Sequence, residues 1–182
     1  MTRALDVLLA SLGLTLGLPL LLILLLAGWL DTGSPLFRQQ RVGRHQRPFM
    51  LVKFRTMRRD TVSVASHLVD PGTITPLGRL LRRSKLDELP QLWNVLRGDM
   101  SLVGPRPCLF SQTELIAARA ARGVFEARPG VTGLAQTSGI DMSTPDKLAR
   151  TDEQMLASLT LGAYFRYILS TTGGRGAGDA VK

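Results

Sequence analysis

The stretch LDELPQLWNVLRGDMSLVGPRP, residues 86–107, places two adjacent carboxylates, an apolar helical segment and a Pro-Arg-Pro run within 22 residues. We expect a helix over residues 87–97 that ends at Gly98, because glycine readily adopts the left-handed conformation that follows helices. Pro90 restricts the start of this helix, since proline is tolerated only in the first turn. The two prolines around Arg106 then require an extended or turned backbone.

The adjacent carboxylates Asp87 and Glu88 carry the sharpest chemical signal. They fall at the predicted helix start and are surrounded in the sequence by basic residues: Arg79, Arg82, Arg83 and Lys85. A helix N-terminus carries partial positive charge, which lowers a carboxylate pKa and attracts phosphate. An ionised aspartate beside a phosphate is a candidate nucleophile, and the second carboxylate is a candidate ligand for a divalent cation. The alternative is that both are ordinary first-turn acids that complement the helix dipole.

Basic side chains form a second group of candidates. Guanidinium groups bind phosphate oxygens through paired hydrogen bonds, and the flanking prolines would aim Arg106 in one direction. Lys53 and Arg55 alternate along a predicted strand, so both point to one face, which is either solvent or a site. For any single arginine, the alternative is a solvated surface charge.

The composition excludes several classes of protein. With 182 residues, a net charge of +9 and 45% hydrophobic residues, the chain suits one folded domain with anionic partners. One cysteine, Cys108, cannot build a disulfide framework, and we interpret it as a packing residue. The two histidines, His45 and His67, are too few for a histidine-based zinc site and are interpreted as solvated. Nucleic-acid binding is disfavoured, because stacking aromatics are not interleaved with the basic residues.

Residues 7–30 contain no charged side chain and 13 leucines, which meets the length criterion for a membrane helix. The weak basic flank and the lack of a small-residue cleavage site argue against a secretory signal. Pro19, near the middle, predicts a kink, because proline removes a backbone hydrogen bond. The segment is therefore either a kinked spanning helix or two half-helices that enter and leave one leaflet. Trp29 is placed as an interfacial anchor.

Eight basic residues and no acid lie between positions 38 and 59. The positive-inside rule places this flank in the cytoplasm, and some of its arginines would face anionic headgroups. The remaining chain predicts short elements and neither a repeat nor a second domain. We expect a hairpin of strands 34–42 and 48–56, helices 75–84, 112–126 and 146–169 (the last with a break at Gly162), irregular segments 57–73 and 128–133, and a disordered tail at 171–182.

These motifs together resemble the bacterial sugar transferases, specifically the monotopic polyprenyl-phosphate phosphoglycosyl transferases. The resemblance is carried by KFRTM at residues 53–57, by residues 86–107 and by RPGVTG at residues 128–133. It extends over residues 7–137, with a fainter continuation to Leu169. Because the sequence leaves no room for an additional N-terminal membrane domain, the chain resembles the small, single-domain members.

The resemblance implies an enzyme that moves a phosphosugar from a UDP-sugar to polyprenyl phosphate and releases UMP. It implies that Asp87 forms a covalent phosphosugar intermediate and that Glu88, together with Asp87, holds Mg²⁺. The predicted substrate-binding residues are basic: Lys53, Arg55, Arg82, Arg106 and Arg128. The resemblance further implies a cytoplasmic-face enzyme of the bacterial inner membrane that begins glycoconjugate assembly.

The resulting prediction is an α+β, mainly helical fold. It comprises a re-entrant helix-break-helix hairpin kinked at Pro19 in residues 1–33, and a cytoplasmic domain with a short β-hairpin in residues 34–170. The implied partners are the UDP-sugar, polyprenyl phosphate and inner-membrane lipid, with no nucleic acid and with a homodimer left open. A non-catalytic membrane-surface module and a metal-dependent lipid phosphatase are the alternatives. Departures from the family pattern leave the sugar undetermined: Leu18, Leu134 and Ile140.

Overall fold

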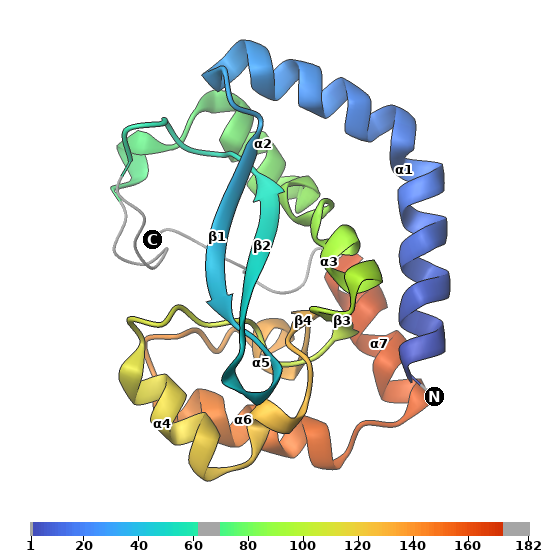
Figure 1. Cartoon of the computed structure of the whole chain (residues 1–182), viewed down its shortest axis with the longest axis vertical. Helices are drawn as coiled ribbons and strands as arrows, with labels where there is room; N and C mark the ends of the chain where they lie inside the picture. Colours follow the sequence, from blue (N-terminus) through green and yellow to red (C-terminus); the bar gives the residue numbers. More distant parts are fainter. Residues whose placement is uncertain (1, 62–69, 173–182) are drawn as a thin grey trace.

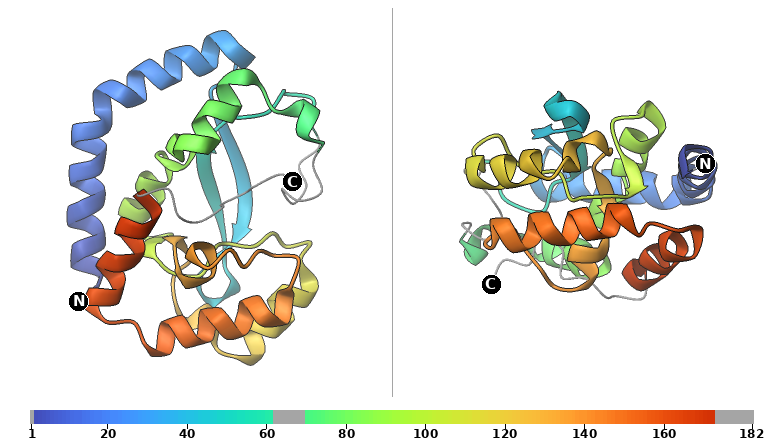
Figure 2. Two further views of the ribbon diagram at one scale, coloured as in Figure 1. Left: turned by 180° about the vertical axis from the view of Figure 1, so that it is seen from behind. Right: turned by 90° about the horizontal axis from the view of Figure 1, so that it is seen from below.

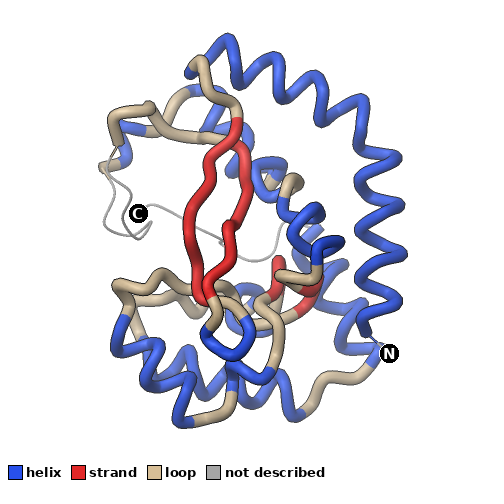
Figure 3. The backbone as a smooth tube through the Cα atoms, viewed as in Figure 1, coloured by secondary structure: helices blue, strands red, loops and turns tan. Residues whose placement is uncertain are grey.

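A computed structural model describes residues 2–61 and 70–172 and shows the predicted α+β, mainly helical fold (Figure 1). The helices are α1 (Thr2–Thr32), α2 (Pro76–Ser84), α3 (Gln91–Arg97), α4 (Thr113–Ala121), α5 (Leu134–Thr137), α6 (Pro145–Ala157) and α7 (Leu161–Thr172). The strands are β1 (Leu36–Val42), β2 (Pro48–Phe54), β3 (Ser101–Val103) and β4 (Gly130–Thr132). Helices surround a central hairpin of β1 and β2, with α1 arching around one side and α4 and α6 at the end near the hairpin turn (Figures 1 and 3).

Helix α1 is continuous and bends about halfway along its length (Figures 1 and 2). Pro19 lies inside it and lacks the N–H that an α-helical hydrogen bond needs, which accounts for the bend. The predicted kink is therefore present, whereas the predicted break into two separate helices is wrong. Among the residues that the structure describes, α1 alone is long and apolar enough to cross a membrane.

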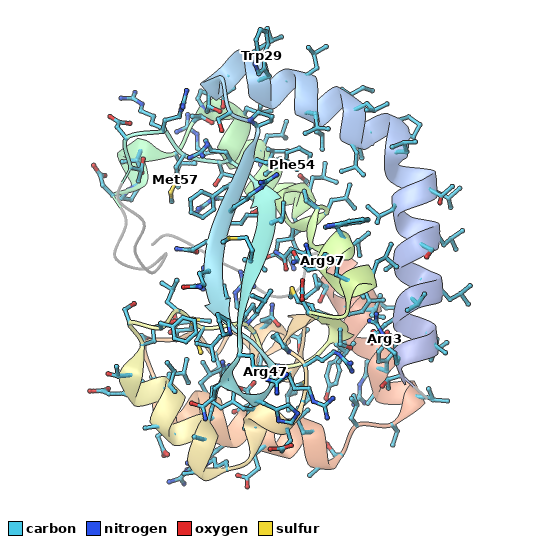
Figure 4. The ribbon with its side chains drawn as sticks, in the orientation of Figure 1. Arg3, Trp29, Arg47, Phe54, Met57 and Arg97 are labelled. Carbon is cyan, nitrogen blue, oxygen red and sulfur yellow. The ribbon has the colours of Figure 1, made fainter. Side chains whose placement is uncertain are left out.

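Two charged residues fasten the N-terminal end of α1 to the rest of the molecule. Asp6 is buried and accepts hydrogen bonds from the hydroxyls of Tyr164 (2.7 Å) and Ser101 (3.0 Å) and from the Leu102 N–H (2.9 Å). Burial and the neighbouring Asp6 carboxylate raise the pKa of Tyr164, so its hydroxyl stays protonated as a donor. Arg3 donates to carbonyls at the C-terminal end of α3, on which this end of α1 packs (Figure 4).

The outer face of α1 remains apolar and uncovered. Figure 4 shows Trp29 at the far end of the helix, pointing away from the rest of the molecule. A continuous exposed apolar face of this kind marks a surface that contacts lipid or protein. Its most exposed side chains are Leu8, Leu16, Leu22, Ile23, Leu26, Trp29 and Leu30.

Strands β1 and β2 pair antiparallel in the register Leu36↔Phe54, which confirms the predicted hairpin with slightly shorter strands. The turn between them has His45 at φ 54°, a left-handed conformation that short loops accommodate. His45 is exposed, which agrees with the prediction of a solvated histidine, and its Nδ1 lies 3.4 Å from the Glu126 carboxylate. The prediction for His67 lies outside the described residues.

Strands β3 and β4 form a short parallel pair that joins distant parts of the chain. The expectation of an irregular segment at residues 128–133 is wrong, because β4 is defined by its pairing partner and not by a local pattern. Gly130 makes the close approach possible: a Cβ at this position would lie 2.1 Å from the Gly104 nitrogen. Residues 104–107 follow β3 as a bend at Gly104 and a segment without regular structure, which agrees with the expected extended or turned backbone.

The helix predictions hold at their capped ends and fail where the chain changes direction. Thr75 caps α2 by accepting the Gly78 N–H (2.9 Å), as expected. The predicted helix 112–126 stops at Ala121, and a 3-10 turn, η5 (Val124–Glu126), follows. The predicted helix 146–169 is two helices, α6 and α7, and the break between them precedes Gly162. The Thr160 hydroxyl accepts a hydrogen bond from the Ala163 N–H in the first turn of α7, so the new helix begins after Thr160. The predicted tail falls mainly outside the described residues.

The largest core lies where α1, α3, β3 and α7 meet. Val95, Met100 and Tyr164 are fully buried there. A second cluster contains Cys108 with Leu115 of α4, which confirms Cys108 as a packing residue. Burial raises the pKa of the Cys108 thiol, so this side chain stays neutral in the core.

Candidate active site

Asp87 and Glu88 lie in a single 3-10 turn, η4 (Leu86–Glu88), and not at the start of an α-helix. The predicted helix over residues 87–97 is therefore wrong at its beginning, since α3 starts only at Gln91. An α-helix starting at Asp87 would need the Pro90 N–H to bond the Leu86 carbonyl, and proline has none. The Leu89 N–H bonds this carbonyl instead (3.2 Å) and closes a tighter turn.

An arginine forms an ion pair with the second of these carboxylates. Arg106 Nη2 lies 2.9 Å from Glu88 Oε1, with both side chains largely buried. Asp87, which precedes Glu88 in the same turn, is 6% exposed. A charge-assisted hydrogen bond of this length holds both partners in a defined direction. The structure therefore brings the predicted Arg106 to the predicted Glu88 across 18 positions of sequence.

Two of the other predicted cations share one face of the hairpin. Lys53 Nζ lies 5.7 Å and the Arg55 guanidinium 5.4 Å from the centre of the Phe37 ring, which confirms that these residues point to the same side. Lys53 is buried, so it does not lie against lipid headgroups. Arg82, at the last turn of α2, donates to the Thr56 hydroxyl at the end of the hairpin (2.9 Å).

A small surface pocket lined by Arg106 is also lined by two polar residues that the sequence did not single out. Arg41 and Gln91 are buried in its lining, together with Lys53. In the sequence, Arg41 is only one of the eight basic residues of the flank, any of which could face lipid headgroups. Gln91 stands three positions after Glu88, and this proximity was its only signal.

Lys85 is a further cation at this site. It ends α2 with φ at 58° and donates to the Thr171 carbonyl of α7 (3.3 Å). Burial lowers the pKa of Lys85, the Glu88 carboxylate opposes this fall, and Arg106 adds to it. Lys85 is therefore coupled electrostatically to both members of the Glu88–Arg106 pair.

Arg128 occupies a different place. Its Nε donates to the Gly98 carbonyl (2.9 Å), at the C-terminal end of α3. The two carboxylates lie before the other end of this seven-residue helix, about 10 Å away at 1.5 Å per residue. The contact that the structure shows for Arg128 is a helix-capping one, and its part in substrate binding stays a prediction.

The residue types at this site suit a phosphate-bearing ligand. Lys53, Arg82 and Arg106 provide donors for phosphate oxygens. Among the described residues, no group of three or more histidine, cysteine, aspartate or glutamate side chains could enclose a metal ion. Mg²⁺ needs no such group, because it is commonly bound by one or two carboxylates together with substrate phosphates. Asp87 and Glu88 fit that mode.

The fold and the site thus combine basic side chains and two carboxylates with an exposed apolar helix. This combination is typical of membrane-associated proteins that act on phosphate-bearing ligands. Comparison with known proteins is more specific. The chain belongs to the bacterial sugar transferase family, whose sequence model matches residues 1–174. The expected family membership is therefore confirmed.

Curated relatives of this chain are named for related reactions. The chain is 49% identical over 145 residues to a UDP-glucose:undecaprenyl-phosphate glucose-1-phosphate transferase of Caulobacter vibrioides, covering 76% of this chain and 54% of the relative. It is 43% identical over 143 residues to a UDP-galactose-lipid carrier transferase of Erwinia amylovora, covering 69% and 30%. It is 38% identical over 154 residues to an undecaprenyl-phosphate galactose phosphotransferase of Salmonella typhimurium, covering 75% and 32%. The chain spans about half of the first relative and about a third of the other two.

Proposed function

We propose that this chain transfers a sugar phosphate from a UDP-sugar to polyprenyl phosphate, giving polyprenyl-diphosphate-sugar and UMP, as a membrane step of bacterial polysaccharide assembly. The observation that carries the proposal is the buried Asp87 beside the Glu88–Arg106 pair in a member of this family. The names of the relatives support UDP-glucose and UDP-galactose as the first donors to test.

In the first step, Asp87 is the nucleophile. One carboxylate oxygen attacks the β-phosphorus of the UDP-sugar, and the bond from this phosphorus to the oxygen bridging the α-phosphate breaks. UMP leaves with that oxygen, and a new P–O bond joins the sugar phosphate to the aspartate. Lys53, Arg82 and Arg106 stabilise the charge that develops on the phosphate oxygens.

In the second step, a phosphate oxygen of the lipid attacks the same phosphorus. The aspartyl P–O bond breaks, which restores the carboxylate and gives the lipid diphosphate sugar. The burial of Asp87 supports this route, because an acyl phosphate shielded from water is protected from hydrolysis.

We propose that Glu88 and Asp87 hold Mg²⁺ when the donor is bound. The ion would supply positive charge to the diphosphate. The orientation of Glu88 towards Arg106 supports a role for this carboxylate in charge balance at the phosphates. Chelation should suppress transfer, and added Mg²⁺ should restore it.

We test the covalent step with the intact mass of the detergent-solubilised protein, mixed with Mg²⁺ and each UDP-sugar in the absence of lipid. The expected result is a sugar-phosphate increment together with released UMP. Polyprenyl phosphate added afterwards should remove the increment and yield the lipid product. Lipid product formed without any adduct would contradict the intermediate, and release of inorganic phosphate without sugar transfer would instead identify a phosphatase.

We also propose that α1 dips into the cytoplasmic leaflet and returns, with its outer face in lipid. The exposed leucines, the bend and the basic residues that follow α1 support this topology. Trp29 is suited to the interface between lipid and water. The proposal places the carboxylates where a soluble nucleotide sugar and a lipid phosphate can meet.

Two aspartates on the outer face of α1 should abolish membrane binding. Leu16 and Ile23 are 73% and 63% exposed, so Leu16→Asp with Ile23→Asp leaves the packing on α3 intact. Each aspartate costs about 2.5–3.5 kcal/mol at the centre of a membrane helix. The measurement is co-flotation with phosphatidylethanolamine–phosphatidylglycerol vesicles, with Gln154→Asp on the exposed side of α6 as the control. Unchanged flotation of the double variant would contradict lipid contact by this face.

A further inference from the structure

Every backbone carbonyl from Pro105 to Cys108 accepts a hydrogen bond from a different part of the fold. The donors are a strand amide, two arginine side chains and a second strand amide. In order, they are Gly130 N–H to Pro105 (2.9 Å), Arg119 Nη1 to Arg106 (2.8 Å), Arg41 Nη1 to Pro107 (3.1 Å) and Val42 N–H to Cys108 (3.0 Å).

These four hydrogen bonds fix the position of residues 105–108, because this segment has few backbone N–H groups that could bond a neighbouring strand. Pro105 and Pro107 have no N–H, so neither can donate to a neighbouring strand. The prolines restrict the backbone on both sides of Arg106, and the carbonyl bonds place it against β4, α4 and β1. The side chain of Arg106 then reaches Glu88.

Arg119 of α4 is held in turn by one carboxylate. It is 1% exposed, and its Nε and Nη2 donate to Asp152 Oδ2 of α6 at 2.9 and 2.7 Å. Because two of its nitrogens are directed to Asp152, the third is aimed at the Arg106 carbonyl. The planar, rigid guanidinium transmits this direction without rotatable bonds.

Stability alone does not account for this buried pair. Removing two charges from water is costly, and an apolar pair of similar volume is often at least as stable. A guanidinium offers what an apolar side chain lacks here, namely a donor in a set direction towards the Arg106 carbonyl. A second ion pair, Arg122–Asp146, joins the same helices at the surface (2.8 Å) and provides a matched comparison.

We infer that Arg119, oriented by Asp152, is a positioning residue for sugar-phosphate transfer. By holding the Arg106 carbonyl, Arg119 determines where the Arg106 guanidinium contacts the diphosphate. The inference rests on the proposed function and adds residues that act through Arg106 and do not touch the substrate. Misplacing a charge-stabilising group by about 1 Å can lower a rate about 100-fold.

The test is a double-mutant cycle in the transfer reaction. Asp152→Asn should lower kcat/KM by about 100-fold, because it weakens the two hydrogen bonds that orient Arg119. Asp146→Asn should leave kcat/KM near the wild-type value. In an Arg106→Ala background, Asp152→Asn should have little further effect, since coupled residues are not additive. Equal losses in both backgrounds would show a merely structural role and overturn the inference.

A second variant guards against loss of the fold. Arg119→Met with Asp152→Leu removes both charges together, so no unpaired charge is left in the core. We expect a melting temperature close to that of the wild type and a loss of kcat/KM like that of Asp152→Asn. Wild-type activity in this folded variant would overturn the inference.

Binding of UDP, measured by calorimetry in the same variants, separates the inference from the proposed function. Weaker UDP binding in Asp152→Asn, with unchanged binding in Asp146→Asn, supports positioning of Arg106 irrespective of turnover. Unchanged UDP binding in both variants overturns it. Absence of transfer by the wild type, with normal UDP binding, would contradict the proposed function only.

Discussion

The Asp87→Asn variant is expected to lose sugar-phosphate transfer by at least about 10⁴-fold, the scale on which removing a catalytic nucleophile acts. Asparagine has nearly the same shape as aspartate, but its amide carries no negative charge to attack phosphorus. The variant should therefore release no UMP from UDP-glucose or UDP-galactose and show no sugar-phosphate increment in its intact mass. Both readouts are made on protein that melts like the wild type.

The control for this prediction is Glu114→Gln, which neutralises an exposed carboxylate in the first turn of α4. It should transfer sugar phosphate at the wild-type rate. An Asp87→Asn variant that still acquired the adduct would place the nucleophile on another residue. Glu88 would then be the first candidate, since it follows directly in the same turn.

The Asp6→Ala variant is expected to lose about 3–5 kcal/mol of unfolding free energy, as when one partner of a buried charged network is removed. Alanine would leave the donors of Tyr164, Ser101 and Leu102 buried without their acceptor. The loss is measured by thermal unfolding in detergent micelles. Asp6→Asn, which keeps an acceptor oxygen, should lose less than Asp6→Ala.

The same variant should also lower transfer, because Ser101 and Leu102 belong to the strand that leads into the Pro-Arg-Pro segment. Asp60→Ala removes an exposed carboxylate and serves as the control, with an expected change within about 0.5 kcal/mol. A wild-type melting temperature for Asp6→Ala would show that α1 is held by its apolar contacts alone.

Local signals determined much of this structure. The uncharged run around Pro19 predicted α1 and its kink, Thr75 predicted the start of α2, and Gly98 predicted the end of α3. The hairpin followed from apolar segments around a short turn. Each of these features depends on residues within a few positions of one another, so a single sequence contains the necessary information. Family membership was likewise carried by contiguous motifs.

Short irregular elements were harder to place. Pro90 restricts the start of the helix, yet the sequence predicts the two carboxylates at a helix start, and they lie in a 3-10 turn. A turn of three residues has no periodicity to detect, and its geometry depends on which carbonyl finds a donor. The parallel pair β3–β4 was missed for a related reason, since each strand has only three residues.

By itself, the sequence determined which residues carry the candidate chemistry: Asp87, Glu88 and the cations that would receive a diphosphate. Tertiary structure alone decided how they are held. It buried Arg41 and Lys53, paired Arg106 with Glu88, and oriented Arg119 through Asp152 towards the Arg106 carbonyl. The physical reason is that burial and hydrogen-bond direction depend on which distant segments pack together. The sequence does not distinguish a charged residue that is solvated from one that is hydrogen-bonded to a buried partner.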